Sequence, residues 1–179
     1  MYYRSRSLLA AAVLTSIWQL PAQADDEAKL DTVLVTGTRG TSRTVLDSPV
    51  PVDVLTADDL KAAGAADGEL GAALQTLLPS FSLPRQSNSG GADHVRAAQL
   101  RGMSPDQVLV LVNGKRRHTS AVVNDSSKIG RGTAPVDFNS IPISAIKRIE
   151  VLRDGAGAQY GSDAIAGVIN IILDDAPEG

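Results

Sequence analysis

The chain has 179 residues, a formal net charge of −3 at pH 7 and no cysteine. Its length suits one domain with a single hydrophobic core. The lack of cysteine excludes disulfides, thiolate nucleophiles and cysteine-based metal sites, and the acidic charge argues against a general nucleic-acid-binding protein.

The first 24 residues have the three parts of a secretory signal peptide. Arg4 and Arg6 form a basic start, an apolar run follows from residue 8 to residue 18, and Ala-Gln-Ala closes the segment. The apolar run is shorter than the roughly 20 residues that span a bilayer. Cleavage after Ala24 leaves 155 residues (179 − 24), and the loss of two arginines changes the net charge from −3 to −5. The alternative is a buried N-terminal helix.

The next segment, DTVLVTGTR followed by GTSRTVLDS, predicts a flexible, extended arm. Val33 and Val35 alternate with Leu34 and Thr36, without helix signals. An arm of this kind can add itself as a strand to the sheet edge of another protein. The alternative is that the same residues pair within their own domain.

Beyond the arm, strands and short helices alternate. PVPVDVLT predicts a strand that either lies at a sheet edge or has its prolines among its first residues, because prolines cannot donate to a β-ladder. Thr56 and Asp59 form a capping box for a helix that ends at Gly64. A second helix begins at Asp67, carries a stripe of leucines and is stopped by Pro79.

The second half of the chain adds further strands. VRAAQLRGM predicts a short strand, and the apolar run at 108–112 is typical of a strand covered on both faces. Asn113-Gly114 predicts a hairpin, IPISAI a single helical turn, and KRIEVLR and GVINIIL two strands. The predicted fold class is therefore α+β: a small mixed sheet of four to five strands with short helices, preceded by a signal peptide and a flexible arm.

The glycine-rich stretch DGAGAQYGS raises the question of nucleotide chemistry. Its spacing, G-x-G-x-x-x-G, is one residue longer than the dinucleotide fingerprint, and only about two helical turns can follow it. His94 and His118 lie in polar loops without a ligand partner at i+3 or i+4, and no serine lies in a nucleophile elbow. We therefore expect no enzyme, no bound metal and no cofactor.

The segment IPISAIKRIEVLRDGAGAQYGSDAIAGVINIIL closely resembles the last segment of the plug domain of TonB-dependent outer-membrane receptors. Three more segments match in the order of that family. DTVLVTGTR is similar to the TonB box, TADDLKAAGAADGELGAALQTLLPSF to the paired helices, and LRGMSPDQVLVLVNGKRRH to the arginine–glycine strand and hairpin. The chain departs from the family at Asp154, where many members have glycine, and at Asn113, where many have aspartate.

The resemblance implies a signal peptide at 1–24, a flexible arm with a TonB box at 25–47, a plug domain at 48–175 and the start of a barrel at 176–179. The family's barrel has 22 strands at about ten residues each. We therefore expect a plug separated from its barrel.

The implied function is gating and substrate recognition in a receptor that takes up a scarce nutrient with energy delivered by TonB. The implied partners are TonB, the 22-stranded barrel and an unidentified small molecule, with no nucleic acid. The implied location is the outer membrane, or the periplasm if the barrel is absent. The alternatives are a soluble periplasmic binding or adaptor module and a truncated, non-functional receptor fragment.

The resemblance also assigns site residues. Arg101 and Arg153 are implied to hold the plug in the barrel, and we expect both to point outward on one side and to be poorly partnered in a chain without a barrel. The implied TonB box comprises Asp31, Thr32, Val33, Leu34, Val35 and Thr36. The three implied substrate-facing loops are residues 85–94, 104–106 and 116–131. They contain Gln86, Ser87, Asn88, Ser104, Asp106, Arg116, Arg117 and His118.

Other residues are expected to be structural. Glycine tolerates backbone angles that other residues avoid, and Gly155 and Gly157 are expected to turn the chain sharply. Tyr160 is expected in the core, and Asn170, in an apolar strand, is expected to have a hydrogen-bond partner. The remaining glycines with an expected backbone role are Gly102, Gly114, Gly161 and Gly167.

Overall fold

The computed structural model describes residues 33–34, 43–44, 50–64, 70–85, 87, 90–125, 129–154 and 156–174. The expected signal peptide and most of the expected arm lie outside these residues. Within the described segments, no helix is both long enough and apolar enough to span a membrane.

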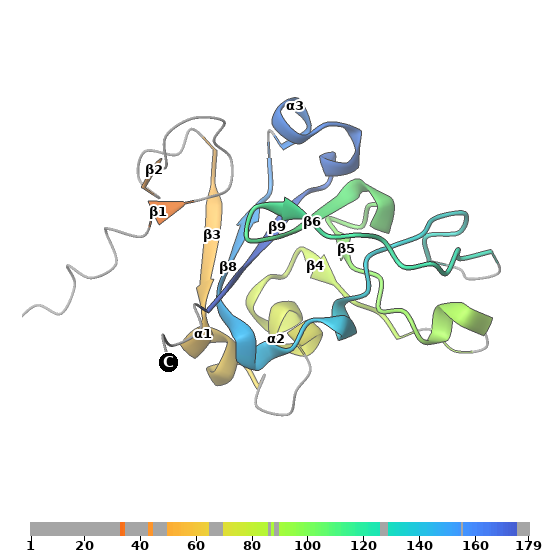
Figure 1. Cartoon of the computed structure of the whole chain (residues 1–179), viewed down its shortest axis with the longest axis horizontal. Helices are drawn as coiled ribbons and strands as arrows, with labels where there is room; N and C mark the ends of the chain where they lie inside the picture. Colours follow the sequence, from red (N-terminus) through yellow and green to blue (C-terminus); the bar gives the residue numbers. More distant parts are fainter. Residues whose placement is uncertain are drawn as a thin grey trace, which may run out of the picture. The chain divides into compact units, whose positions relative to one another are not determined.

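A five-stranded mixed sheet organises the described part of the chain (Figure 1). Strands β6 and β9 run parallel, and the other neighbours run antiparallel. The edge strand predicted after the prolines is confirmed, because β3 has one neighbour. In spatial order the strands are β3 (Val52–Thr56), β8 (Ile146–Leu152), β9 (Gly167–Leu173), β6 (Val108–Val112) and β7 (Lys115–Arg116).

Two small antiparallel sheets accompany the main one. Strand β1 (Val33–Leu34) pairs with β2 (Arg43–Thr44), and β4 (Phe81–Ser82) pairs with β5 (Gln99–Leu100). The α+β class and the mixed sheet predicted from the sequence are confirmed.

The helices are short. The α-helices are α1 (Ala57–Ala62), α2 (Leu70–Leu77) and α3 (Ala156–Tyr160). The 3₁₀ turns are η3 (Gly90–Asp93), η4 (Pro105–Gln107), η5 (Phe138–Ser140), η6 (Ile143–Ala145) and η7 (Ser162–Ala164). The capping box of α1 is confirmed: Thr56 Oγ1 accepts from the Asp59 N–H at 3.2 Å, and Asp59 Oδ2 accepts from the Thr56 N–H at 2.9 Å. The predicted start of α2 at Asp67 lies outside the described residues.

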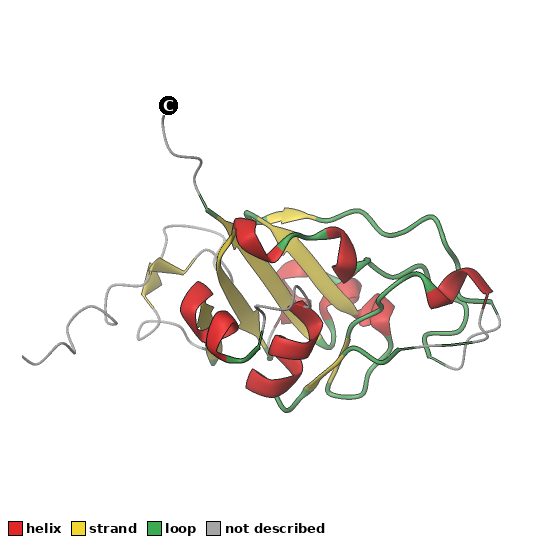
Figure 2. Ribbon diagram, turned by 90° about the horizontal axis from the view of Figure 1, so that it is seen from below, coloured by secondary structure: helices red, strands yellow, loops and turns green. Residues whose placement is uncertain are grey.

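Strand β6 is covered on both faces, as its unbroken apolar run predicts. Val108 and Val110 join the larger core cluster, which includes leucines of α1 and α2. Leu109 and Leu111 join a smaller cluster on the other face, which includes Ala156 of α3. Helices therefore pack against both faces of the sheet (Figure 2).

Gly167, the first residue of β9, lies where no side chain fits. Its φ is 142°, and a Cβ at this position would lie 2.6 Å from both the Leu152 carbonyl oxygen and Leu100 Cδ2. Only glycine allows the segment before β9 to pass this close to the end of β8.

The other glycines of this region differ in their backbone roles. Gly161 ends α3 with a φ of 94°, as expected. The expected sharp turn at Gly157 is wrong, because Gly157 lies inside α3 and a Cβ there would meet nothing within 4 Å. Gly155 lies outside the described residues.

We predict opposite effects for two glycine-to-alanine changes. Gly167→Ala should lower the free energy of unfolding by about 3 kcal/mol, because it adds a clash to a left-handed φ. Gly157→Ala should raise it by up to about 1 kcal/mol, because alanine is the better helix former. Urea unfolding of the full chain followed by circular dichroism measures both, and equal midpoints would contradict the prediction.

Candidate functional site

Arg101 lies in a tight turn at the end of β5. Arg101 and Gly102 both have left-handed φ angles, 56° and 71°, and the Met103 N–H donates to the Leu100 carbonyl at 3.1 Å. The turn directs the guanidinium toward the segment that follows β8. There Arg101 Nη1 lies 2.7 Å from Asp154 Oδ1, and Nη2 donates to the Ile165 carbonyl at 3.2 Å.

Arg153, the residue before Asp154, contacts a different carboxylate. Its Nη2 lies 2.7 Å from Asp53 Oδ1 on β3. Within the described residues, Arg153 Nε and Asp53 Oδ2 are buried without a hydrogen-bond partner. The prediction that Arg101 and Arg153 are poorly partnered is wrong, because each forms an ion pair with a carboxylate of the same domain.

The β6–β7 hairpin is fixed by two asparagines. Asn113 and Gly114 form the turn with φ angles of 48° and 75°. The Gly114 N–H donates to Oδ1 of the buried Asn170 at 3.0 Å, which confirms the partner predicted for this side chain. Asn113 Oδ1 accepts from the Leu173 N–H at 2.9 Å. The two amides therefore join the hairpin to β9.

Arg116 attaches the same hairpin to the segment between α3 and β9. Its Nη1 lies 2.6 Å from Asp163 Oδ2, and its Nη2 donates to the Tyr160 carbonyl at 2.6 Å. Tyr160 is half-buried at the border of the smaller core cluster, so it is a peripheral member of the core rather than a central one.

A cavity of about 230 Å³ lies beside Val108, Leu109 and Val110 of β6. Its wall combines apolar groups of Val108 and Val110 with the charged residues Asp106, Arg116 and Arg117. Two of the three loops predicted to face the substrate thus meet at one cavity. Other expected loop residues lie near it in sequence: Ser104 precedes η4, and His118 is exposed after β7.

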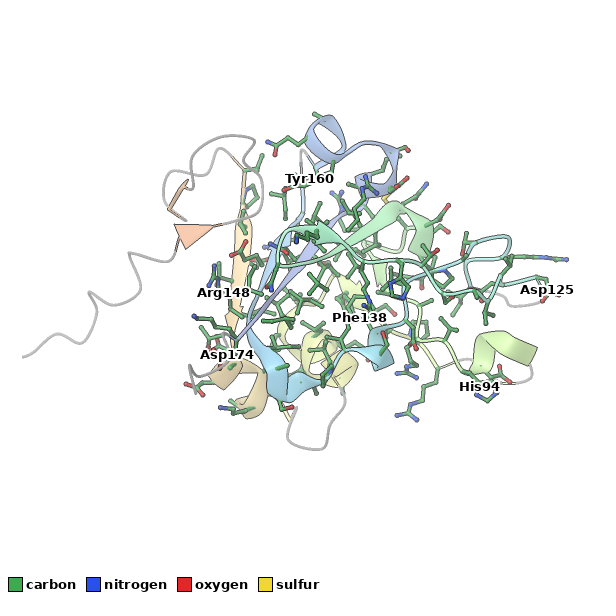
Figure 3. All side chains as sticks on the ribbon, in the orientation of Figure 1. His94, Asp125, Phe138, Arg148, Tyr160 and Asp174 are labelled. Carbon is green, nitrogen blue, oxygen red and sulfur yellow. The ribbon has the colours of Figure 1, made fainter. Side chains whose placement is uncertain are left out.

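The remaining predicted loop lies against the long segment that follows β7. A Cβ on Gly91 would lie 3.1 Å from Val122 Cγ1. His94 and Asp125 both lie at the end of the molecule away from β3 (Figure 3). In this loop Ser87 is exposed, whereas Gln86 and Asn88 lie outside the described residues.

The segment that resembles a TonB box is described at two positions. Val33 pairs with Thr44 and Leu34 with Arg43 in the β1–β2 ladder. The alternative given above, that residues of this segment pair within their own domain, therefore holds for Val33 and Leu34. Asp31, Thr32, Val35 and Thr36 lie outside the described residues.

An ion pair inside the sheet is a feature that we did not predict. Glu150 of β8 is fully buried, and its Oε1 lies 3.0 Å from Arg148 Nη2. The signal in the sequence is a glutamate within the apolar run of KRIEVLR. A buried carboxylate needs a charged or hydrogen-bonding partner, and the second residue before it supplies one.

Among the described residues, no group of three or more histidine, aspartate or glutamate side chains could hold a metal ion. The candidate site is made of the cavity, the loops around it and the ion pairs of Arg101 and Arg153.

Comparison with known proteins identifies this arrangement. The family model "TonB-dependent Receptor Plug Domain" matches residues 44–168, and the chain belongs to this family. The ferric enterobactin receptor PirA of Pseudomonas aeruginosa is 34% identical over 93% of this chain. The vitamin B12 transporter BtuB of Vibrio vulnificus is also 34% identical over 93% of it. The chain spans 24% and 25% of these two relatives.

Solved structures agree with the family. The ferric enterobactin receptor PfeA of Pseudomonas aeruginosa matches with a TM-score of 0.54 and 34% identity, over 70% of this chain and 18% of the receptor. The ferric citrate transporter FecA, 22% identical, matches in fold with a TM-score of 0.54 over 75% of this chain and 19% of FecA. The relatives are named as receptors and transporters.

We predict that the buried ion pair is essential for stability. Arg148→Met should lower the free energy of unfolding by about 3 kcal/mol, because it leaves the buried Glu150 carboxylate without this guanidinium. Adding Glu150→Gln should recover part of the loss, because the buried charge is then gone.

The matched control is Lys61→Met on α1. The Lys61 and Asp58 side chains are 68% and 92% exposed, so the loss should stay below about 1 kcal/mol. Equal effects of Arg148→Met and Lys61→Met in urea unfolding would contradict the prediction.

Proposed function

We propose that this chain is the plug of an outer-membrane receptor that imports a scarce nutrient with energy delivered by TonB. The family match over residues 44–168 carries the proposal. In this proposal residues 1–24 direct export, 25–47 form the arm, and 48–175 fill a barrel. The names of the relatives favour a receptor over a free periplasmic adaptor.

TonB contacts the arm through residues 31–36. Support comes from the alternating apolar sequence and from the ladder in which Val33 and Leu34 already form a strand. A segment that adopts extended backbone at this position can exchange one strand partner for another. Strand addition by TonB would then replace β2 as the neighbour of β1.

The substrate contacts the plug at the loops around the cavity. Support comes from the meeting of residues 105–106 and 116–117 at its wall. Arginine and aspartate side chains at an otherwise apolar hollow can orient a polar ligand. The two relatives above are named for ferric enterobactin and vitamin B12, and we propose a substrate of that kind, a nutrient that needs active uptake.

The barrel contacts the plug through Arg101 and Arg153. Support comes from their positions: both follow strands, and both retain guanidinium hydrogens beyond those used in the bonds described above. Arginine can bind a carboxylate with two parallel bonds.

We predict that proline in the box abolishes TonB binding. Leu34→Pro removes a backbone N–H and restricts the extended strand that TonB must pair with. Binding of the mature chain to the purified periplasmic domain of TonB should fall at least about tenfold by titration calorimetry. Asp47→Pro, outside the box, is the control, and a similar loss with both variants would argue against strand addition at the box.

We predict that the loops around the cavity determine affinity for the substrate. In a full-length receptor that carries this chain, Arg117→Ala or the deletion of residues 86–91 should weaken substrate binding about tenfold. Lys61→Ala, on α1, should leave binding unchanged. Unchanged affinity after alteration of all three loops would overturn this part of the proposal.

A further inference from the structure

Two walls of the cavity beside β6 differ in how firmly they are held. One wall is η4, from which Pro105 and Asp106 line the cavity. The other comes from residues 129–135, in the second half of the long segment that follows β7, and we name these residues the return arm. Ala134 and Pro135 of the return arm line the cavity.

The η4 wall is bonded to the main sheet. Pro105 is buried at the start of η4, and its ring fixes its own φ. The Val108 N–H, at the start of β6, donates to the Pro105 carbonyl. The Ala166 N–H, just before β9, donates to the Gln107 carbonyl at 2.9 Å. These bonds tie η4 to the two buried strands at the centre of the sheet.

The return arm is shaped by a tight turn. The N–H and the hydroxyl of Thr133 both donate to the Gly130 carbonyl, at 3.0 Å and 2.6 Å. The Asn124 N–H donates to the Thr133 carbonyl at 2.9 Å, and the Gly132 N–H donates to the Asn124 carbonyl at 2.6 Å. All four bonds lie within the long segment, so they fix the shape of the turn but not its distance from η4.

Gly130 is the point at which the return arm contacts η4. A Cβ on Gly130 would lie 2.9 Å from both Cγ and Cδ of Pro105 and 2.8 Å from Thr133 Oγ1. The proline ring cannot rotate away as a flexible side chain could, so a side chain at position 130 would displace the return arm from η4. Gly132 also has a left-handed φ, 85° against 63° for Gly130, but a Cβ there would meet nothing within 4 Å.

We propose that Gly130 is a specificity-determining residue, because its contact with Pro105 sets the width of the cavity and so limits which part of a substrate enters. The cavity has a volume of about 230 Å³, whereas a cavity of roughly 150 Å³ holds one benzene molecule. It therefore admits one compact group, of about the size of a substituted ring. Gly130 acts as a positioning residue through Ala134 and Pro135. The inference rests on the proposed function, in which the loops around this cavity receive the substrate.

The test uses a thiol placed on the return arm. The chain has no cysteine, so Ala134→Cys introduces a single reactive group at the cavity wall. The probes are N-ethylmaleimide, which carries one small ring, and N-pyrenylmaleimide, which carries a large fused ring system. The measured quantity is the ratio of their labelling rates in the full chain, followed by mass spectrometry. Lys61→Cys, at a side chain that is 68% exposed on α1, corrects for the intrinsic reactivity of the two probes.

The thiol at position 134 should react several-fold faster with the small probe than with the large one. Adding Gly130→Ala should reduce this preference about fivefold, because the displaced return arm admits the large probe. Gly132→Ala is the matched control: it adds similar backbone strain without the clash, so the preference should stay within about twofold. Adding Pro105→Ala to Gly130→Ala should restore the preference, because Cγ and Cδ of the proline ring are then gone.

Thr133→Val tests the same turn by a second route and decides the question if Gly130→Ala does not fold. It keeps the size of the side chain but removes the hydroxyl that donates to the Gly130 carbonyl at 2.6 Å. The turn should loosen, and the preference for the small probe should fall about twofold. Circular dichroism identifies unfolded variants, which would lose the preference altogether.

Three results would each overturn the inference. They are an equal loss of preference in Gly130→Ala and Gly132→Ala, no restoration by Pro105→Ala, and an unchanged preference in both Gly130→Ala and Thr133→Val. The labelling needs neither a barrel nor a substrate, so these results would leave the proposed function standing. Absence of nutrient uptake by a full-length receptor that carries this chain would instead overturn the proposed function, while the size selectivity measured by labelling would remain.

Discussion

The burial of β9 is the constraint on which the rest of the fold depends. This strand lies between β8 and β6, and its residues from Gly167 to Ile171 are buried. A strand covered on both faces must have side chains that fit two cores, and every polar group in it must be bonded. Asn170 meets that requirement through the β6–β7 hairpin, so the hairpin and the strand position each other.

The position of β9 also places part of the proposed site on one crossover. The parallel pairing of β6 and β9 requires the chain to cross over between them, and the crossover contains residues 113–166. Arg116, Arg117 and His118, the long segment after β7 and Arg153 all belong to this stretch, whereas the other two substrate-facing loops precede β6. One topological requirement therefore places Arg116, Arg117, His118 and Arg153 on the crossover between two buried strands.

Much of this fold could be predicted from local patterns. Three features depend on residues only a few positions apart, so their signals are local in the sequence. They are the capping box of α1, the Asn113-Gly114 turn and the burial of both faces of β6. The ion pair of Arg153 with Asp53 spans 100 positions and depends on the β3–β8 register, for which the sequence gives no local sign. Glycine at position 157 predicts a turn because glycine tolerates unusual backbone angles, yet Gly157 lies inside α3, and the residue type alone does not distinguish the two.

The edge position of β3 has a mechanical consequence. β3 is the first strand of the main sheet in chain order, and it is attached to β8 alone. A pull on the arm therefore reaches the sheet at Val52, at the end of the ladder where Val52 is paired with Leu152. If the force points away from the sheet, the backbone hydrogen bonds between β3 and β8 bear it one after another instead of all at once. The Asp53–Arg153 ion pair is next to Val52, where the force first reaches the sheet. This ion pair would therefore break early, and the other four strands would stay in place.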